Sequence, residues 1–400
     1  MQRLVLWPNE SPTHLSNNGP SPLPESAFKG TELVYKIGQF IFTLFVFLVA
    51  LDLMSGSFKL FGSDYAKELV TIAGNPFISL FVGMLATAVI QSSSTTTTMI
   101  VGLVAAGTMT PIEATPMIMG ANIGTSVTST IVSLGHIGNR SEYQKAISAA
   151  TVHDFFNIIT VIILFILELS TGALSSAATG LADFFFTEAG EGGKTKGILD
   201  YTTKAFAKWI LGLTATEAYP KGMPFVSLPI ALVLLFVSLR SLTKLLKAFI
   251  IGKVQENLER FVFGHPVKSL SAGFVLTTAV QSSSVTSSLI VPLVASDKVS
   301  LYKAFPFLMG ANIGTTTTAL IAALFLGVGS PNALAIAFVH LLFNLFGVFI
   351  LFPIPQVRRI PIYLAKGLGK LTLSNRIYGV LYVVIVFFIV PGFFIFLTQL

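Results

Sequence analysis

Two short runs of hydroxyl side chains are the residues of this sequence best suited to chemistry. QSSSTTTT occupies 91–98 and QSSSVTSS occupies 281–288, and both lie inside strongly apolar stretches. Polar groups in apolar surroundings are costly unless they have partners. Hydroxyls and unpaired N–H groups at a helix start bind oxyanions, whereas hydroxyl and amide oxygens suit a hard cation such as Na+. The runs therefore predict an oxyanion site, a sodium site or both.

The alternative is that these hydroxyls serve only their own helices. Serine and threonine in membrane helices often bond to the carbonyl four residues earlier or help helices to pack. Two runs in one register, each followed by MGANIGT (119–125 and 309–315), favour a site. The heptapeptide can be read as a small-residue packing face, but its asparagines, Asn122 and Asn312, need partners in apolar surroundings.

Ionisable residues inside apolar stretches are further candidates. Asp154 stands near the start of a span, and its counterpart in the second half is Leu341. We favour a cation ligand or proton site there over a surface carboxylate at a helix start. His153 and His340 occupy matched positions, which favours structural hydrogen bonds over proton transfer. Arg140 is either a membrane-surface residue or an oxyanion clamp.

No motif indicates an enzyme. The sequence has no HExxH, GxSxG or P-loop pattern, which are the patterns of common hydrolases and nucleotide-binding enzymes. His153 could serve an intramembrane serine protease, but seven clustered hydroxyl residues favour coordination over one activated nucleophile. Because the chain has no cysteine, disulfides and thiolate metal sites are excluded.

The composition indicates a polytopic, all-helical membrane protein. Of its 400 residues, 53% are hydrophobic and 11% are charged, against about 25% charged in ordinary soluble domains. A bilayer crossing needs about 20 apolar residues, and we expect crossings near 34–54, 114–134, 146–169, 223–239, 331–353 and 378–399. The basic residues lie beside these spans, so the net charge of +7 does not indicate nucleic-acid binding.

The chain contains two copies of one unit. QSSS and MGANIGT both recur at an offset of 190 residues, and HDFFN at 153–157 matches HLLFN at 340–344 at an offset of 187. Lys/Arg-rich segments at 240–268 and 357–376 are expected in the cytoplasm, and the mixed segment 183–222 outside. When the membrane crossings between these segments are counted, the two copies have opposite orientations in the membrane. The sequence therefore predicts an inverted repeat.

The segments on either side of each glutamine are too short to cross a bilayer. Residues 76–90 would span about 22 Å as a helix, short of the roughly 30 Å hydrocarbon core. We therefore expect a re-entrant helical hairpin in each repeat with QSSS at its tip. Broken helices that meet at the membrane midplane are typical of secondary transporters.

These features predict six regions. They are a disordered N-terminal tail (1–30), a first repeat (31–170, hairpin about 70–108), an extracytoplasmic linker (171–222), a second repeat (223–354, hairpin about 264–298), a cytoplasmic basic interfacial segment (355–377) and a C-terminal transmembrane helix (378–400).

QSSSTTTT, MGANIGTS, ATVHDFFN and the second QSSS with MGANIGTTTT resemble the type II sodium-dependent phosphate cotransporters over roughly 31–390. The resemblance implies symport of HPO4 2− with Na+, in which a core domain carries the site across the membrane. The phosphate ligands that it implies are Gln91, Ser92, Ser93, Ser94, Gln281, Ser282, Ser283, Ser284 and Arg140. Together with the oxygen-bearing candidates above, it implies Na+ ligands at Gln91, Ser93, Asn122, Thr125, Thr128, Asp154, Gln281, Ser283, Asn312, Thr315 and Thr318.

The resemblance also implies finer properties. Asp154 matches an aspartate of the electrogenic members, so transport is expected to be electrogenic. The short, cysteine-free linker and the end after one final span fit a bacterial homologue. Ala311 stands where some relatives have serine, so one cation ligand would be missing or supplied by the backbone.

Taken together, the sequence predicts a Na+-coupled phosphate importer of the bacterial inner membrane. Na+ and phosphate are its cargo, the lipid bilayer surrounds it, and no organic cofactor or nucleic acid is expected. The alternatives are a symporter of another oxyanion (sulfate or arsenate) and a phosphate-sensing membrane protein that docks a partner at 240–268. The sequence leaves the stoichiometry and a homo-oligomeric state open.

Overall fold

The computed structural model describes residues 30–60, 74–188, 198–257, 262–326 and 331–397, and its regular elements there are all helices. The predicted tail 1–30 lies outside this range except for Gly30. The helices are α1 (Gly30–Leu60), α3 (Pro76–Ile90), α4 (Ser93–Ala105), α5 (Pro111–Gly124), α6 (Val127–Ser133), α7 (Arg140–Thr171), α8 (Ala173–Glu188), α9 (Ile198–Leu213), α10 (Pro224–Asn257), α11 (Pro266–Val280), α12 (Ser283–Ala295), α13 (Leu301–Leu326), α14 (Pro331–Leu351), α15 (Pro355–Ser374), α16 (Ile377–Val384) and α17 (Val390–Leu397).

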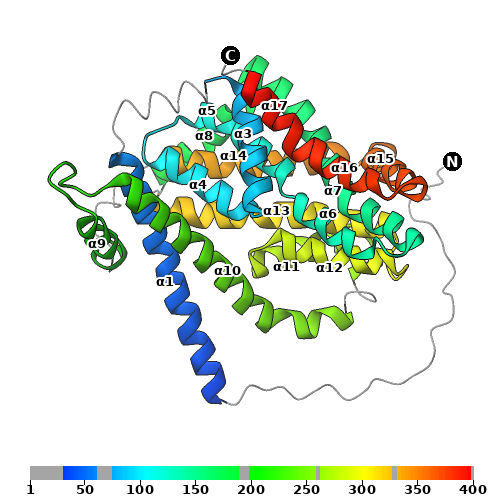
Figure 1. The fold of residues 1–400 in the computed structure, drawn as a ribbon, viewed down its shortest axis with the longest axis horizontal. Helices are drawn as coiled ribbons and strands as arrows, with labels where there is room; N and C mark the ends of the chain where they lie inside the picture. Colours follow the sequence, from blue (N-terminus) through cyan, green and yellow to red (C-terminus); the bar gives the residue numbers. More distant parts are fainter. Residues whose placement is uncertain (1–29, 61–73, 189–197, 258–261, 327–330, 398–400) are drawn as a thin grey trace.

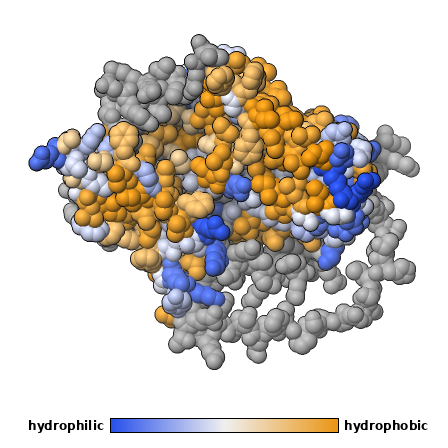
Figure 2. All heavy atoms as spheres, in the orientation of Figure 1, coloured by the Kyte–Doolittle hydropathy of each residue, from blue (hydrophilic) through white to orange (hydrophobic). Residues whose placement is uncertain are grey.

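Seven helical stretches of the described chain are long and apolar enough to cross a membrane. They are Val34–Leu60, Pro111–His136, Arg140–Thr171, Pro224–Leu242, Leu301–Leu326, Pro331–Leu351 and Ile377–Leu397. Each predicted window falls on one of them within a few residues. Figure 2 shows the apolar side chains covering most of the described surface in that view, as lipid contact requires. The prediction of an all-helical, multi-pass membrane protein is confirmed.

Each QSSS motif lies at the turn of a helical hairpin. The arms α3 and α11 have 15 residues each, and the arms α4 and α12 have 13 each. Asn75 and His265 cap the first arms, and a proline follows each cap, which suits a helix start. The first arms end at Gln91 and Gln281, whose φ angles of 56° and 55° reverse the chain. An identical local sequence thus gives an identical break.

The two halves contact each other in matched pairs. Within each half the first hairpin arm packs on the MGANIGT helix, α3 on α5 and α11 on α13. The second arm reaches across, so that α4 packs on α13 and α14 while α12 packs on α6 and α7. In Figure 1, α1 with α10 and α16 with α17 lie on opposite sides of this central group.

Glycines allow the first arms to approach the MGANIGT helices closely. A Cβ on Gly120 would lie 1.8 Å from the Leu80 carbonyl oxygen, and one on Gly310 would lie 1.9 Å from that of Leu270. Gly83 and Gly273 make the reciprocal contacts. The heptapeptide is therefore a packing face, as its alternative interpretation predicted, although its asparagines have a separate role described below.

The backbones of the two halves differ where the MGANIGT helix ends. The first is interrupted at Thr125 and Ser126 between α5 and α6, whereas its counterpart α13 runs unbroken through Thr315 and Thr316. The region predicted as a linker, 171–222, contains α8 and α9, and α8 packs on α14. This region is therefore more ordered than a simple connection.

We expect Gly120→Ala to destabilise the protein, because the added methyl group would overlap the α3 backbone. Overpacking of this kind costs about 1–3 kcal/mol. Thermal unfolding in detergent measures it. Gly180→Ala is the matched control, since nothing lies within 4 Å of the new Cβ and alanine favours helix. Equal melting temperatures for the two variants would contradict the close packing of α3 on α5.

Candidate functional site

The two QSSS motifs meet at one cavity of about 270 Å³. All eight motif residues line it, four from each half, together with Phe236, Leu239 and Arg240 of α10. Arg240 is the charged side chain in this lining. Segments 190 residues apart in the sequence therefore face the same space, as the paired motifs predicted.

The hairpin turns leave hydrogen-bond donors facing this cavity. Ser92 caps α4 by accepting the Thr95 N–H at 3.2 Å, and Ser282 caps α12 through the Val285 N–H at 3.4 Å. The N–H groups of the first two residues of each helix, Ser93 and Ser94 in α4 and Ser283 and Ser284 in α12, precede the first intrahelical bonds and have no intrahelical partner. The hydroxyls of Ser93, Ser94, Ser283 and Ser284 also make no hydrogen bond to any described residue. These groups can bind an oxyanion.

The hydroxyls further along each helix bond to their own backbone. Thr96 and Thr97 donate to the carbonyls of Ser92 and Ser93 at 3.1 and 2.8 Å. In the second half, Thr286 and Ser287 repeat these bonds at 3.1 and 2.8 Å. The hydroxyl runs are thus divided: their first serines face the cavity, and these four residues bond to their own helices.

The two glutamines differ in their contacts. The amide oxygen of Gln281 accepts the Thr318 hydroxyl at 2.6 Å, and its nitrogen donates to Thr317 at 3.1 Å. Gln91 is exposed and its side chain has no such bond within the described chain. The matching hydroxyl, that of Thr128, is buried without a partner there. The two glutamines therefore stand in the same local sequence, but they make different hydrogen bonds.

Thr125 and Thr315 bond to their own helices. Their hydroxyls donate to Ala121 and Ala311, each at 2.9 Å. A hydroxyl oxygen that donates one hydrogen bond retains lone pairs. Both residues can therefore still coordinate a cation.

Buried amides connect the two halves. Asn312 donates to the Asn157 side chain at 2.8 Å, Asn157 donates to the Asn122 carbonyl at 2.7 Å, and Asn344 donates to the Asn122 side chain at 3.1 Å. His153 bonds to the Asn312 amide oxygen. Buried networks of this kind favour one arrangement of helices, although the amide oxygen of Asn344 and the Nδ1 atom of His153 have no partner within the described chain. Asn157 and Asn344 were not among the predicted site residues, although they end the repeated HDFFN and HLLFN.

Asp154 is fully buried at 0% exposure, and neither of its carboxylate oxygens has a hydrogen bond within the described chain. The hydroxyls of Ser126 and Tyr382 are its nearest polar neighbours. Ser126 belongs to the interruption between α5 and α6, where side chains donate to the carbonyls of Ala121, Asn122 and Ile123 and leave each of them a second lone pair. A buried carboxylate beside such carbonyls is suited to a cation.

The family comparison matches both halves of the chain. The model of the family described as Na+/Pi-cotransporter matches residues 46–188 and 234–374. The chain belongs to this family. The two matched segments contain one QSSS hairpin each, which supports the reading of two repeated halves.

Individual transporters agree with this assignment. Sodium-dependent phosphate transport protein 2A of Rattus norvegicus is 33% identical over 437 residues, covering 91% of this chain and 67% of the relative. Protein 2B of Homo sapiens is 31% identical over 441 residues, covering 87% and 63%. This chain thus spans about two thirds of their length. No solved structure gives a significant match. The predictions of a transporter and of a chain that is not an enzyme are confirmed by the family.

Three predicted ligands of this cotransporter lie in other surroundings than the QSSS residues. Arg140 is exposed at the first residue of α7 and does not line the cavity between the QSSS motifs. The cation there is Arg240, which the sequence analysis counted only as a topological signal. The amide oxygens of Asn122 and Asn312 each accept one hydrogen bond from another helix, which uses one of their two lone pairs.

The contact between α6 and α12 can be tested by cross-linking. The hydroxyls of Ser129 and Ser287 lie 2.7 Å apart, and the chain has no cysteine. We expect Ser129→Cys/Ser287→Cys to lose both free thiols on mild oxidation, counted by mass tagging after denaturation. Ser129→Cys/Ser296→Cys is the control, because Ser296 lies about 13 Å further along the chain from Ser287 at helical rise.

A second pair calibrates this assay. The hydroxyls of Ser57 and Ser227 lie 2.8 Å apart between α1 and α10. If Ser57→Cys/Ser227→Cys cross-links while the Ser129–Ser287 pair keeps both thiols, the packing of α12 on α6 is wrong.

Proposed function

We propose that this chain carries out sodium-dependent phosphate cotransport, the activity of its family, and that the cavity between the QSSS motifs holds the phosphate. The observation that carries the proposal is the convergence of unbonded serine hydroxyls and helix N-termini from both halves. Donors from two helix starts suit an anion with four oxygens. Gln91, Ser92, Ser93 and Ser94 would bind it from one side, and Gln281, Ser282, Ser283 and Ser284 from the other.

Arg240 would supply the charge that the hydroxyls lack. It lines the cavity from α10, and its guanidinium can bind two phosphate oxygens at once. Because Arg240 is exposed, it can also attract the anion before binding. We assign it the phosphate role that the resemblance gave to Arg140.

The sodium ions would bind beside the phosphate at oxygen-rich sites. Gln281 and Thr318 hold their oxygens together at 2.6 Å, and Thr315 lies on the same helix as Thr318. Asp154 and Thr128 present buried oxygens without partners among the described residues, next to the helix interruption at Thr125. The remaining predicted oxygens, from Gln91, Ser93 and Ser283, face the phosphate cavity.

We assign Asn122 and Asn312 a different role from the predicted one. Their amides connect the two halves through Asn157 and Asn344. They would hold the helices that carry the ligands.

The candidate spans support an inverted repeat with re-entrant hairpins. Two of them, Arg140–Thr171 and Pro224–Leu242, separate the end of α6 from the start of α13. If each hairpin leaves the membrane on the side that it enters, only these two spans cross between α6 and α13. Because the number of crossings is even, α13 then runs antiparallel to α5. The arms, at 15 and 13 residues, would span about 22 and 20 Å, short of the roughly 30 Å hydrocarbon core.

This topology completes the proposal. Hairpins that enter from opposite faces suit alternating access, with the site exposed to one side at a time. Regions 1–30, 240–268 and 355–377 would lie in the cytoplasm and 171–222 outside. We place the chain in a bacterial inner membrane because its linker is short and lacks cysteine.

The proposed activity is tested by uptake of labelled phosphate into proteoliposomes under an imposed Na+ gradient. We expect uptake that stops when K+ replaces Na+ and that excess sulfate does not inhibit. Gln91→Gly and Gln281→Gly should each reduce it at least tenfold. Glycine adopts the left-handed conformation of these positions without strain, so a loss reports the missing amide. Na+-independent uptake, or full activity of both variants, would refute the proposal.

Arg240→Gln should raise the KM for phosphate. A charge-assisted hydrogen bond contributes about 1.5–3 kcal/mol, so the increase should be roughly 10- to 100-fold. Arg140→Gln is the matched control and should leave KM unchanged, since Arg140 does not line the cavity. The opposite pattern would return the phosphate role to Arg140.

Asp154→Gly should make transport less electrogenic, because it removes a buried carboxylate proposed to hold Na+. Uptake is compared with and without an inside-negative K+ diffusion potential. We expect stimulation by the potential in the parent protein and little in the variant. Asp297→Asn, which changes an exposed carboxylate, is the control. Unaltered voltage dependence in Asp154→Gly would exclude Asp154 from charge coupling.

A further inference from the structure

A second polar cavity, of about 360 Å³, lies away from the QSSS motifs. It is formed by α7, by the connection from α12 to α13, and by α15. Three lysines line it, Lys145, Lys366 and Lys370, against one carboxylate, Asp297. We call it the basic interfacial cavity. Its lining therefore carries a net charge of +2.

The charges of this cavity are only partly balanced. Lys145 contacts Asp297 at 2.5 Å, which offsets one positive charge. Lys366 lies over the Tyr302 ring, 4.3 Å from its centre, a contact that attracts a cation without neutralising it. Lys366 and Lys370 have no carboxylate partner among the described residues. They lie four residues apart on α15 and so project from the same face.

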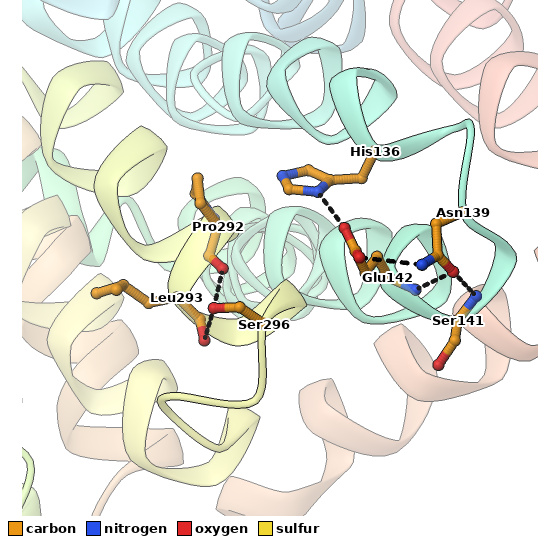
Figure 3. A network of polar contacts seen from close by, with 7 residues as sticks. All are labelled: His136, Asn139, Ser141, Glu142, Pro292, Leu293 and Ser296. Carbon is orange, nitrogen blue, oxygen red and sulfur yellow. Dashed lines mark hydrogen bonds and ion pairs between the residues drawn. The ribbon is translucent and has the colours of Figure 1, made fainter.

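The walls of the cavity are held in place. A Cβ on Gly369 would lie 2.1 Å from the Ser148 hydroxyl, so α15 packs directly on α7. Figure 3 shows the neighbouring polar groups bonding to one another: Glu142 to His136 and Asn139, and Ser296 to carbonyls of its own helix. Those groups are already partnered. Gln144 and Ser300 also line the cavity, and the lysines are its cationic donors.

The surface of α15 beside the cavity is apolar and exposed. Ile360, Tyr363, Leu364 and Leu371 are each at least 44% exposed. A helix with lysines and arginines on one face and such side chains on another lies in the membrane interface. In Figure 2, hydrophilic residues gather at the right-hand edge, where Figure 1 places α15. The lysines would thus stand at headgroup level.

We propose that the basic interfacial cavity binds the phosphate of an anionic phospholipid from the cytoplasmic leaflet. Lysine-rich pockets between membrane helices on the cytoplasmic side take such headgroups. Positive charge and crossing counts place the start of α7, the end of α12 and α15 in the cytoplasm, and these three segments meet here. The exposed apolar side chains favour a lipid over free phosphate, because they can cover its acyl chains.

The bound headgroup would affect one hairpin. The connection from α12 to α13 contains Asp297 in the left-handed conformation, with φ of 59°, and it forms one wall of the cavity. A phosphate group could replace Asp297 as the partner of Lys145. The bound phosphate would then bridge this connection, α7 and α15. Headgroup binding would thereby restrain the base of the second hairpin, although the binding itself does not depend on the proposed transport function.

The proposal is tested by native mass spectrometry of the full-length protein with added phosphatidylglycerol or phosphatidylcholine. We expect selective binding of phosphatidylglycerol. Lys366→Gln/Lys370→Gln should weaken it roughly 30-fold, since each lysine near an anionic surface contributes about tenfold or less. Lys298→Gln/Arg359→Gln removes the same charge from the same region but not from the cavity lining. It should stay within about twofold of the parent.

Three results would overturn the proposal. They are equal binding of the two lipids, equal binding by the two double variants, and displacement of phosphatidylglycerol by excess inorganic phosphate. The last would make the cavity a site for the free anion. Na+-driven uptake in phosphatidylcholine vesicles verifies that the lysine variant is folded, because neither lysine lines the cavity between the QSSS motifs.

Discussion

Unpaired backbone inside a membrane protein is the constraint on which this fold depends. Such backbone is tolerated only when it is buried in protein or faces a polar cavity. The left-handed glutamines end two helices at the shared cavity, and two serines restart them. What the break exposes, N–H groups and serine hydroxyls, is also what an oxyanion needs. The same N–H groups and hydroxyls thus make the helix break energetically costly and give the site its capacity to bind an anion.

Supporting two such breaks requires unusually close helix packing. Gly120 and Gly310 bring the MGANIGT helices against the first hairpin arms, leaving no room for a side chain. The asparagines of the same heptapeptides point elsewhere and join the halves through Asn157 and Asn344. The same seven-residue sequence therefore packs on a hairpin arm through its glycine and bonds to the other half through its asparagine. Both contacts hold the hairpin tips at the shared cavity.

Much of this was predictable from the sequence, because it depends on local pattern and on repetition. The spans follow from apolar length, the hairpin arms from the distance between proline and glutamine, and the shared cavity from the paired QSSS motifs. Arg240 could not be assigned, because a basic residue at a span end is equally explained by topology. The difference between Gln91 and Gln281 was also out of reach, since both stand in the same local sequence. Such features arise only when distant helices come together.

The reciprocal packing of the second hairpin arms has a consequence for the origin of the chain. Because α4 packs on α13 and α14 while α12 packs on α6 and α7, each half is completed by the other. An ancestral single unit with this architecture would have had to pair with an oppositely oriented copy of itself. In the proposed inverted topology, joining the copies through α8 to α10 would have fixed both orientations in one polypeptide. It also freed each copy to change alone, as the lone carboxylate of Asp154 opposite Leu341 illustrates.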